Sequence, residues 1–490
     1  MSAERKNKPE AEPVIFWFRS DLRLADNAGL TAAVQSGRDV IPVYILDDHS
    51  PQQWKRGGAS RWWLHQSLLA LDADLQKSGF HPLVCLHGTA GDMLDAVISE
   101  TGASGVYWNR CYEPWAMARD KEIKQNLKSR GLDVQSFGGY LLFEPWDIKN
   151  KTGGDYKVFT PFSRACLERA GTLRPPLDVC KPPRKYKGRI FARENNLPQL
   201  ALMPRIKWYH GMAAEWTPGE AGAWKRFTGF ADDGAWEYKN NRDFPAVDGV
   251  SRLSPFLHFG EISPHQIWHG ISSRIAHTDS PQGPAHAQGF LRQILWREFS
   301  YHLLFHAPDF PDKPWNKKFA HFPWQPDEAV QEKWRRGQTG YPIIDAGMRQ
   351  LWQTGWMHNR VRMIVGSFFV KNLLQPWRDG EDWFWDTLVD ADLGNNAAGW
   401  QWIAGCGADA APYFRIFNPV LQSQKFDPEG SYIRHYVPEL AHMPDRFIHA
   451  PWTAPPLLRA EAAGYVPPMV DINASRDRAL EAYAVSKSIA

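Results

Sequence analysis

The sequence predicts a chain of two parts, a doubly wound α/β domain followed by a larger all-α domain. In the first part, unbroken apolar runs alternate with segments of helical periodicity, which is typical of parallel strands joined by helices. From Trp224 to about Tyr436 the pattern is mostly helical, with long amphipathic segments. Between them lies a stretch rich in Pro, Gly, Lys and Arg, which predicts a long surface connection.

Four apolar runs predict the strands of the first part. They cover residues 14–18, 40–46, 83–86 and 106–108. Helical periodicity lies between and after them, at about 27–36, 60–77, 92–100 and 114–129. Asn27, Ser60 and Pro114 are residues that favour helix starts. This alternation predicts a parallel, Rossmann-like sheet.

The same patterns predict where the parts begin and end. We expect a polar tail at 1–13, an α/β domain at 14–145, a linker at 146–217 and a helical domain at 218–490. Within the helical domain, amphipathic segments at 289–306, 341–354 and 358–374 predict long helices.

Composition excludes several classes of protein. The five Cys residues are widely spaced and form no C-x-x-C pair, which argues against a disulfide framework, a zinc site or an iron–sulfur cluster and fits a reducing cytoplasm. His302 and His306 share a helix face without a carboxylate partner pattern, so we expect packing and no metal. The sequence shows no signal peptide and no run of about 18 apolar residues. We therefore expect that the protein is not exported and does not span a membrane.

The start of the α/β domain lacks a dinucleotide motif. G-x-G-x-x-G is expected directly after a first strand, but Arg19-Ser-Asp-Leu-Arg23 stands there. The net charge of +3 permits a nucleic-acid partner without arguing for one. The chain also holds 24 Trp, most of which we expect to serve core packing.

Several segments, taken in order, resemble the cryptochrome/photolyase family. They are Phe18-Arg-Ser-Asp-Leu-Arg-Leu-Ala-Asp-Asn27, Tyr156-Lys-Val-Phe-Thr-Pro-Phe162, Ser251-Arg-Leu-Ser254, Trp296-Arg-Glu-Phe299, Thr339-Gly-Tyr-Pro342, Gly355-Trp-Met-His-Asn-Arg360, Trp400-Gln-Trp402 and Pro412-Tyr-Phe-Arg-Ile-Phe-Asn-Pro419. The resemblance covers nearly the whole chain. Asn395-Asn-Ala-Ala-Gly-Trp400 and Gln293 are most similar to the bacterial class III photolyases.

The resemblance implies a folded FAD in the helical domain, active as FADH⁻. The residues that match cofactor-binding positions are Tyr238, Val250, Ser251, Arg252, Leu253, Ser254, Arg362, Asp390, Ala391, Asp392 and Asn396. Arg252 would offset negative charge on the phosphates, and Arg362 and Asp390 match an ion pair beside the flavin. Asn396 matches the residue that faces flavin N5.

The implied activity is light-driven repair of cyclobutane pyrimidine dimers in DNA, in which excited FADH⁻ gives an electron to a flipped-out dimer. The matching DNA-binding positions are Arg242, Gln293, Trp296, Asn359, Arg360 and Trp402. Trp324, Trp377 and Trp400 match an electron relay from the surface to the flavin. A monomer suffices for this chemistry.

Two positions bear on which lesion is repaired, and with Asn396 they are the expected catalytic residues. Met363 stands where (6-4) photolyases carry a catalytic His, which favours cyclobutane dimers. Gln293 stands where many dimer photolyases carry Glu, and an amide stabilises charge less well than a carboxylate does. A (6-4) photolyase and a blue-light receptor of the cryptochrome type are the alternatives, although Asn396 and the short segment after 471 argue against a receptor.

An antenna chromophore is also implied for the α/β domain. Tyr112 and Glu113 match positions that contact a folate, 5,10-methenyltetrahydrofolate. A carboxylate can accept hydrogen bonds from the amino groups of this molecule. A plain surface glutamate at position 113 is the alternative.

Overall fold

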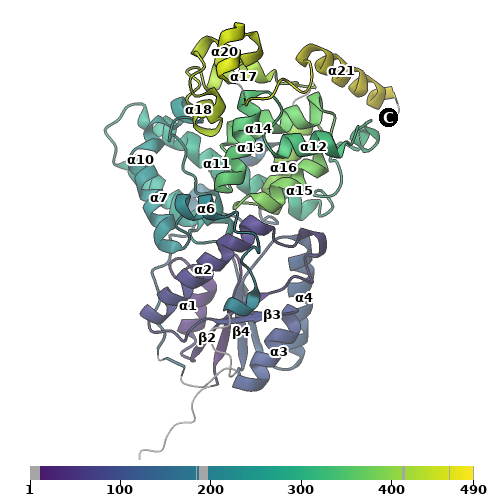
Figure 1. The fold of residues 1–490 in the computed structure, drawn as a ribbon. Coiled ribbons are helices and arrows are strands. Elements are labelled where there is room, and N and C mark those ends of the chain that lie inside the picture. The colour runs from purple at the N-terminus through teal and green to yellow at the C-terminus, as the bar shows by residue number, and fades with distance from the viewer. Residues whose placement is uncertain (1–11, 184, 187–196, 411–413, 463, 489–490) are drawn as a thin grey trace, which may run out of the picture.

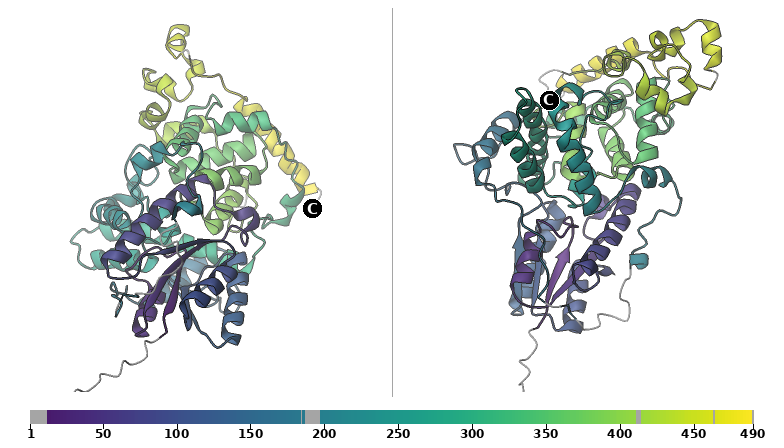
Figure 2. Two further views of the ribbon diagram at one scale, coloured as in Figure 1. Left: turned by 60° about the horizontal axis from the view of Figure 1, so that its bottom comes forward. Right: turned by 90° about the vertical axis from the view of Figure 1, so that its left-hand side faces the viewer.

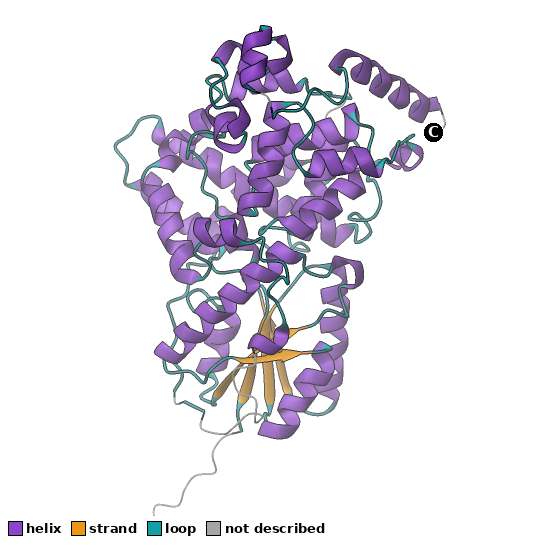
Figure 3. Cartoon of the chain, viewed as in Figure 1, coloured by secondary structure: helices purple, strands orange, loops and turns teal. Residues whose placement is uncertain are grey.

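The computed structural model describes residues 12–183, 185–186, 197–410, 414–462 and 464–488. Most of the predicted tail, part of the predicted linker and Pro412 and Tyr413 of the last matching segment lie outside these residues. A sheet with helices on both faces forms one half of the molecule, and a larger helical half is stacked on it (Figures 1 and 3). The predicted fold class, an α/β domain followed by an all-α domain, is confirmed.

The sheet has five parallel strands in the order β3-β2-β1-β4-β5. The strands are β1 (Val14–Phe18), β2 (Val40–Leu46), β3 (Val84–His87), β4 (Gly105–Asn109) and β5 (Asp133–Phe137). Periodicity predicted the first four, because β1 and β2 are buried along their whole length. It did not predict β5, a partly exposed edge strand of sequence DVQSF without an apolar run.

Helices connect the strands where they were predicted. They are α1 (Ala28–Gln35), α2 (Gly58–Lys77), α3 (Ala90–Thr101) and α4 (Pro114–Ser129). Asn27 caps α1 by accepting the Leu30 N–H at 3.1 Å, and Pro114 opens α4. Ser60 does not cap α2, since that helix begins two residues earlier. In the described part of the segment after β5, the α-helices are α5 (Phe159–Glu168) and α6 (His210–Glu215), with short 3-10 turns at Ala170–Thr172 and Leu197–Leu200.

The helical half begins near residue 220. Its helices are α7 (Glu220–Asp232), α8 (Tyr238–Asn241), α9 (Ser254–His258), α10 (Pro264–Ala276), α11 (Gly283–His306), α12 (Glu328–Arg335), α13 (Pro342–Thr354), α14 (Asn359–Ser367), α15 (Trp377–Thr387), α16 (Leu393–Ala404), α17 (Pro419–Phe426), α18 (Ser431–Tyr436), α19 (Asp445–Ile448), α20 (Pro456–Glu461) and α21 (Ile472–Ser488). The predicted helix 358–374 is broken after α14 by a π-helical turn at Phe368–Asn372. Helices α17 and α20 lie far from the sheet (Figures 1 and 2). The exact domain boundaries stay a prediction.

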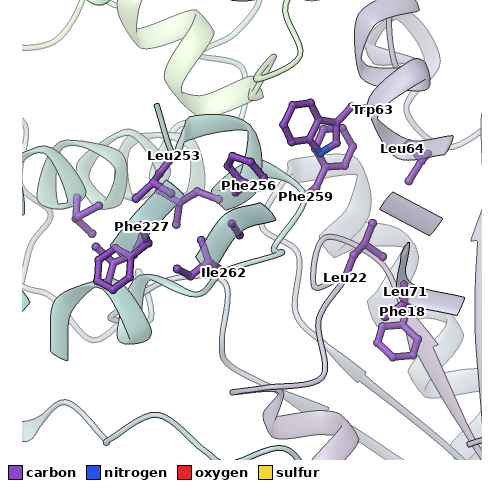
Figure 4. Close-up of a cluster of buried hydrophobic side chains, with 14 of the residues drawn as sticks. Phe18, Leu22, Trp63, Leu64, Leu71, Phe227, Leu253, Phe256, Phe259 and Ile262 are labelled. Carbon is purple, nitrogen blue, oxygen red and sulfur yellow. The ribbon is translucent and has the colours of Figure 1, made fainter. Parts of the chain in front are cut away.

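The hydrophobic core continues across the contact between the two halves. Trp63 of α2 stacks on Phe259 of the helical half with ring centroids 6.0 Å apart (Figure 4). Beside this contact, buried Glu261 accepts hydrogen bonds from Trp63 Nε1 at 3.2 Å and from the Gly219 N–H at 2.7 Å. Glu298 of α11 accepts the N–H of Leu142 at 2.8 Å. Buried carboxyl groups of the helical half therefore accept hydrogen bonds from backbone and side-chain donors of the rest of the chain.

Candidate active site

A cavity of about 590 Å³ lies in the helical half, between α8, α9, α11, α14 and α16. Its volume falls within the roughly 300–1,000 Å³ of ligand pockets. The predicted site residues that line it are Tyr238, Arg242, Val250, Ser251, Arg252, Leu253, Ser254, Gln293, Trp296, Asn359, Arg362, Met363, Asp390, Asp392, Asn396, Trp400 and Trp402. Positions far apart in the sequence thus meet around one space.

Six of the predicted residues do not line this cavity. Ala391 is buried between Asp390 and Asp392, which do line it. The others are Arg360, Trp324, Trp377, Tyr112 and Glu113.

The loop before α9 is held in an unusual backbone conformation. Arg252 has φ of +51°, the left-handed region that residues with a Cβ seldom adopt. Its guanidinium forms an ion pair with Glu215 of α6 and lies between the indole rings of Trp216 and Trp356, 4.8 and 4.7 Å from their centroids. The positive charge is therefore already partnered by a carboxylate, and its part in offsetting phosphate charge stays a prediction. Backbone N–H groups and the Ser hydroxyls are the remaining donors of this loop.

An ion pair stands on the cavity wall, where the sequence predicted one. Arg362 Nη2 lies 3.0 and 2.8 Å from the two carboxylate oxygens of Asp390. Its Nε donates to the Met357 carbonyl at 2.7 Å, which fixes the plane of the guanidinium.

Asp392 is the centre of a buried polar network. One of its oxygens accepts the hydroxyls of Tyr140, at 2.9 Å, and Tyr301. The other accepts the N–H and the side-chain amide of Asn395, at 2.9 and 2.7 Å. Burial would raise the pKa of Asp392, but the adjacent His258, Arg297 and the Tyr301 hydroxyl lower it well below its usual range. The carboxylate is therefore ionised at neutral pH.

Sequence reasoning missed the partners of Asp392. Tyr140 belongs to the loop after β5, and no periodicity or motif signalled its hydrogen bond to a residue of the other half. Arg297 lies inside the recognised Trp296-Arg-Glu-Phe299 segment, which was a usable signal. Its guanidinium lies 4.2 Å above the Tyr140 ring, and Nη2 is buried without a hydrogen-bond partner.

Asn396 is held by the backbone of α15. Its side-chain nitrogen donates to the carbonyl of Glu381 at 3.2 Å. Because this bond fixes the amide plane, the side chain is presented to the cavity in one orientation. The side chain of the same residue, Glu381, is buried, and burial raises the pKa of its carboxyl group well above its ordinary value.

Aromatic and basic side chains gather at the other side of the cavity. Trp296 stacks face to face on Phe159 of α5, with centroids 3.5 Å apart and an interplanar angle of 6°, so that only one of its faces is open to a ligand. Arg242 and Arg360 lie beside the same carboxylate, Asp243, at 3.8 and 2.8 Å. Asp243, which the sequence did not single out, thus partly neutralises both arginines.

The three predicted relay tryptophans belong to one hydrophobic cluster. Trp377 and Trp400 are buried in it and Trp324 is partly buried against it. Trp400 packs on Phe384, with centroids 4.9 Å apart, and lies 6.3 Å from Trp334. Trp334 is buried and its indole N–H has no partner, and no sequence signal distinguished it from a core residue.

A second, smaller cavity of about 80 Å³ lies where the two halves meet at the carboxyl ends of the strands. Glu113 lines it together with Arg19, Arg56 and Arg119. Tyr112 does not line it, since this side chain is buried and donates to Glu144 at 2.7 Å. The two predicted antenna residues therefore face different surroundings.

Within the described residues, no group of three His, Cys, Asp or Glu side chains is suited to hold a metal ion. His302 and His306 lie with ring centroids 4.5 Å apart, and His306 is 3.1 Å from Asp155. Among the same residues, no helix is both long and apolar enough to cross a bilayer.

Comparisons with known proteins agree with this geometry. Residues 14–182 match the family "DNA photolyase", and residues 290–485 match "FAD binding domain of DNA photolyase". The chain is 49% identical to the deoxyribodipyrimidine photo-lyase of Agrobacterium fabrum, over 97% of this chain and 98% of that protein. It is 39% identical to cryptochrome-2 of Arabidopsis thaliana, over 97% of this chain and 79% of that protein.

A solved structure is also similar over the full length. The crystal structure of a bacterial class III photolyase from Agrobacterium tumefaciens superposes with a TM-score of 0.93 at 48% identity, covering 99% of this chain and 100% of that one. The helical half is an FAD-binding domain. By sequence, by fold and by the residues of its cavity, the chain belongs to the photolyase/cryptochrome family.

Proposed function

We propose that the protein is a light-driven DNA photolyase that splits cyclobutane pyrimidine dimers. One observation carries the proposal: a single cavity brings the residues that match cofactor positions together with Trp296, Trp402 and Met363, which match lesion-reading positions. A receptor needs the first set and has no use for the second. The names of the photolyase relatives support the same activity.

The residues present fit FAD. The strained loop at 250–254 offers N–H and hydroxyl donors for phosphates, and the Arg362–Asp390 pair places a cation and an anion on the cavity wall. When bound in its reduced anionic form, FAD supplies a light-driven electron to the dimer and receives it back, so that the repair has no net redox change.

The outer side of the cavity is suited to two adjacent, linked nucleotides of one strand that are flipped out of a duplex. The open face of Trp296 and the side chain of Trp402 offer stacking surfaces, each worth about 1–3 kcal/mol per base. Arg242 and Arg360 would contact phosphates, with Asp243 orienting both. Because a damaged base stacks and pairs poorly, extrusion costs less for a dimer than for intact thymines.

Two supporting roles belong to the same proposal. Trp324, Trp377 and Trp400 would pass an electron from the surface toward the cavity, and their shared hydrophobic cluster supports this route. Glu113 would contact a folate antenna in the smaller cavity. We also propose action as a monomer without a metal, because electron transfer from the flavin needs neither a second chain nor a metal ion. All five Cys are free, which supports a cytoplasmic site of action.

The deciding experiment illuminates the reduced protein with oligonucleotides that carry either a cyclobutane dimer or a (6-4) product. We expect thymine absorbance to recover with the dimer alone. Recovery with neither lesion would leave the receptor as the better assignment, and recovery with the (6-4) product alone would overturn the lesion assignment.

Met363 gives a sharper test of lesion choice. It lines the cavity and its sulfur lies 4.0 Å from the Asn359 amide nitrogen. Met363→His puts a polar ring where the dimer would pack, so repair of dimers should fall at least about tenfold, a loss of about 1.4 kcal/mol of transition-state stabilisation, with no (6-4) activity gained. Unchanged dimer repair would remove the argument from Met363.

A further inference from the structure

His258, at the end of α9, stands in the wall between the two cavities. It lines both the large cavity and the smaller one at the contact between the halves. The side chain is only 6% exposed, so each ring nitrogen is limited to the neighbours that the fold supplies. No sequence motif pointed to this residue.

The two neighbours of the ring are charged groups from different parts of the chain. Arg56, which precedes α2, places Nη1 3.1 Å from His258 Nε2. On the other side, His258 Nδ1 lies 3.6 Å from a carboxylate oxygen of Asp392 and makes no hydrogen bond. Arg56 also lines the smaller cavity, whereas Asp392 lines the large one.

The chemistry of Arg56 decides which nitrogen carries the proton. A guanidinium has only N–H donors and does not lose its proton in proteins. Nε2 must therefore present its lone pair to Arg56, and a neutral imidazole then carries its single proton on Nδ1. That nitrogen is the one that lies 3.6 Å from a carboxylate oxygen of Asp392. A second proton on Nε2 would set two N–H groups and two positive charges against each other at 3.1 Å.

We propose that Arg56 is a positioning residue that keeps His258 neutral with its proton on Nδ1, and that it thereby keeps a second cation away from Asp392 beside the FAD site. The other ionisable groups around Asp392 are Arg297, Tyr140 and Tyr301, all buried. The inference rests on the proposed FAD site for its consequence, but the tautomer itself does not. Without Arg56, Nε2 is free to take a proton from solvent, and a cation forms next to Asp392.

Nitrogen NMR of the ¹⁵N-histidine-labelled protein without FAD tests the tautomer directly. His258→Asn identifies the signal of His258 among the 17 His. We expect a protonated Nδ1 and an unprotonated Nε2 from pH 6 to 8. A proton on Nε2 in the unaltered protein, alone or beside one on Nδ1, overturns the proposal without any variant and without any repair assay.

Substitution of Arg56 tests whether this residue sets the protonation of His258. In Arg56→Met the His258 signal should titrate, with a doubly protonated ring at pH 6, while Arg56→Lys should keep the original tautomer because ammonium also only donates. Arg119→Met is the matched control, because Arg119 lines the same smaller cavity without contacting His258. A His258 signal that is unchanged in Arg56→Met contradicts the proposal.

The FAD-loaded variants extend the test to the cofactor site. Because a cation beside Asp392 favours the anionic reduced cofactor, the midpoint potential of FAD in Arg56→Met should be more positive than in Arg119→Met at pH 6. The two potentials should converge at pH 9, where the imidazole is neutral. Equal potentials at both pH values would show that the protonation of His258 does not affect the FAD potential, and would overturn that part of the proposal even if the tautomer is as expected.

Discussion

The inner side of the large cavity and its mouth are built in different ways. On the inner side, where the helical half meets the α/β half, buried carboxylates receive several hydrogen bonds each, as Asp392 and Glu298 do. At the mouth, Met363, Gln293 and Asn359 are partly or fully exposed and make one long or local contact each.

The difference separates folding from recognition. A buried polar network whose members are all paired stabilises one arrangement, and loss of one member leaves the others unpaired. Side chains with few partners are free to exchange water for a ligand at small cost. We therefore expect substitutions on the inner side to act on stability, and substitutions at the mouth to act on repair.

Asp392→Ala should have the largest effect. It leaves the N–H of Asn395 without its acceptor, and it leaves the buried Tyr140 and Tyr301 hydroxyls, which lie 2.9 Å apart, with one acceptor fewer between them. We expect the free energy of unfolding to fall by about 3–5 kcal/mol, measured by chemical denaturation. Asp477→Ala, which removes an exposed carboxylate, is the control and should change stability by less than about 0.5 kcal/mol. A loss from Asp392→Ala as small as the control's would contradict the contrast between the two sides.

The pH dependence of stability comes next. Burial raises the pKa of Glu261 to about 8. In the unfolded chain Glu261 releases its proton at a lower pH than in the folded protein. The folded state is therefore favoured by this group at acidic pH, and that stabilisation is lost as the pH rises to 8. Each pH unit in this window costs about 1.4 kcal/mol. The stability difference between the unaltered protein and Glu261→Gln, measured by thermal unfolding, should shrink from pH 5 to pH 8; a constant difference would show that Glu261 is ionised throughout.

The sequence predicted the fold wherever the residues of one segment were enough to indicate its secondary structure. Strands buried on both faces, such as β1 and β2, leave unbroken apolar runs, whereas the edge strand β5 leaves none. For the cavity, resemblance to a family supplied the lining residues, because their spacing alone is that of ordinary helices. His258 and Tyr140 escaped both approaches, since their role depends on how the two halves meet.

Gly380→Ala tests the packing of Trp400, a predicted relay residue that lines the large cavity. A Cβ at this position of α15 would lie 2.2 Å from the Trp400 ring, so the indole must move. We expect a loss of about 1–3 kcal/mol in the free energy of unfolding, together with slower light-driven reduction of FAD. Gly229→Ala, in the exposed part of α7 with open space around it, should instead gain about 0.5–1 kcal/mol. Reduction at an unchanged rate in Gly380→Ala would argue that Trp400 is not in the electron route.

Gln293→Glu should have the smallest effect on folding and a clear one on substrate. Gln293 donates only to the Gly289 carbonyl of its own helix, at 3.2 Å, so stability should change by less than about 0.5 kcal/mol. A carboxylate accepts a hydrogen bond about 1 kcal/mol more strongly than an amide does, which predicts about fivefold tighter binding of a dimer whose thymine N–H reaches this position. The dissociation constant for a dimer-containing oligonucleotide measures this, and undamaged DNA of the same sequence is the control. Equal tightening for both DNAs would mean that position 293 does not read the lesion, and the mouth would lose its assigned part in recognition.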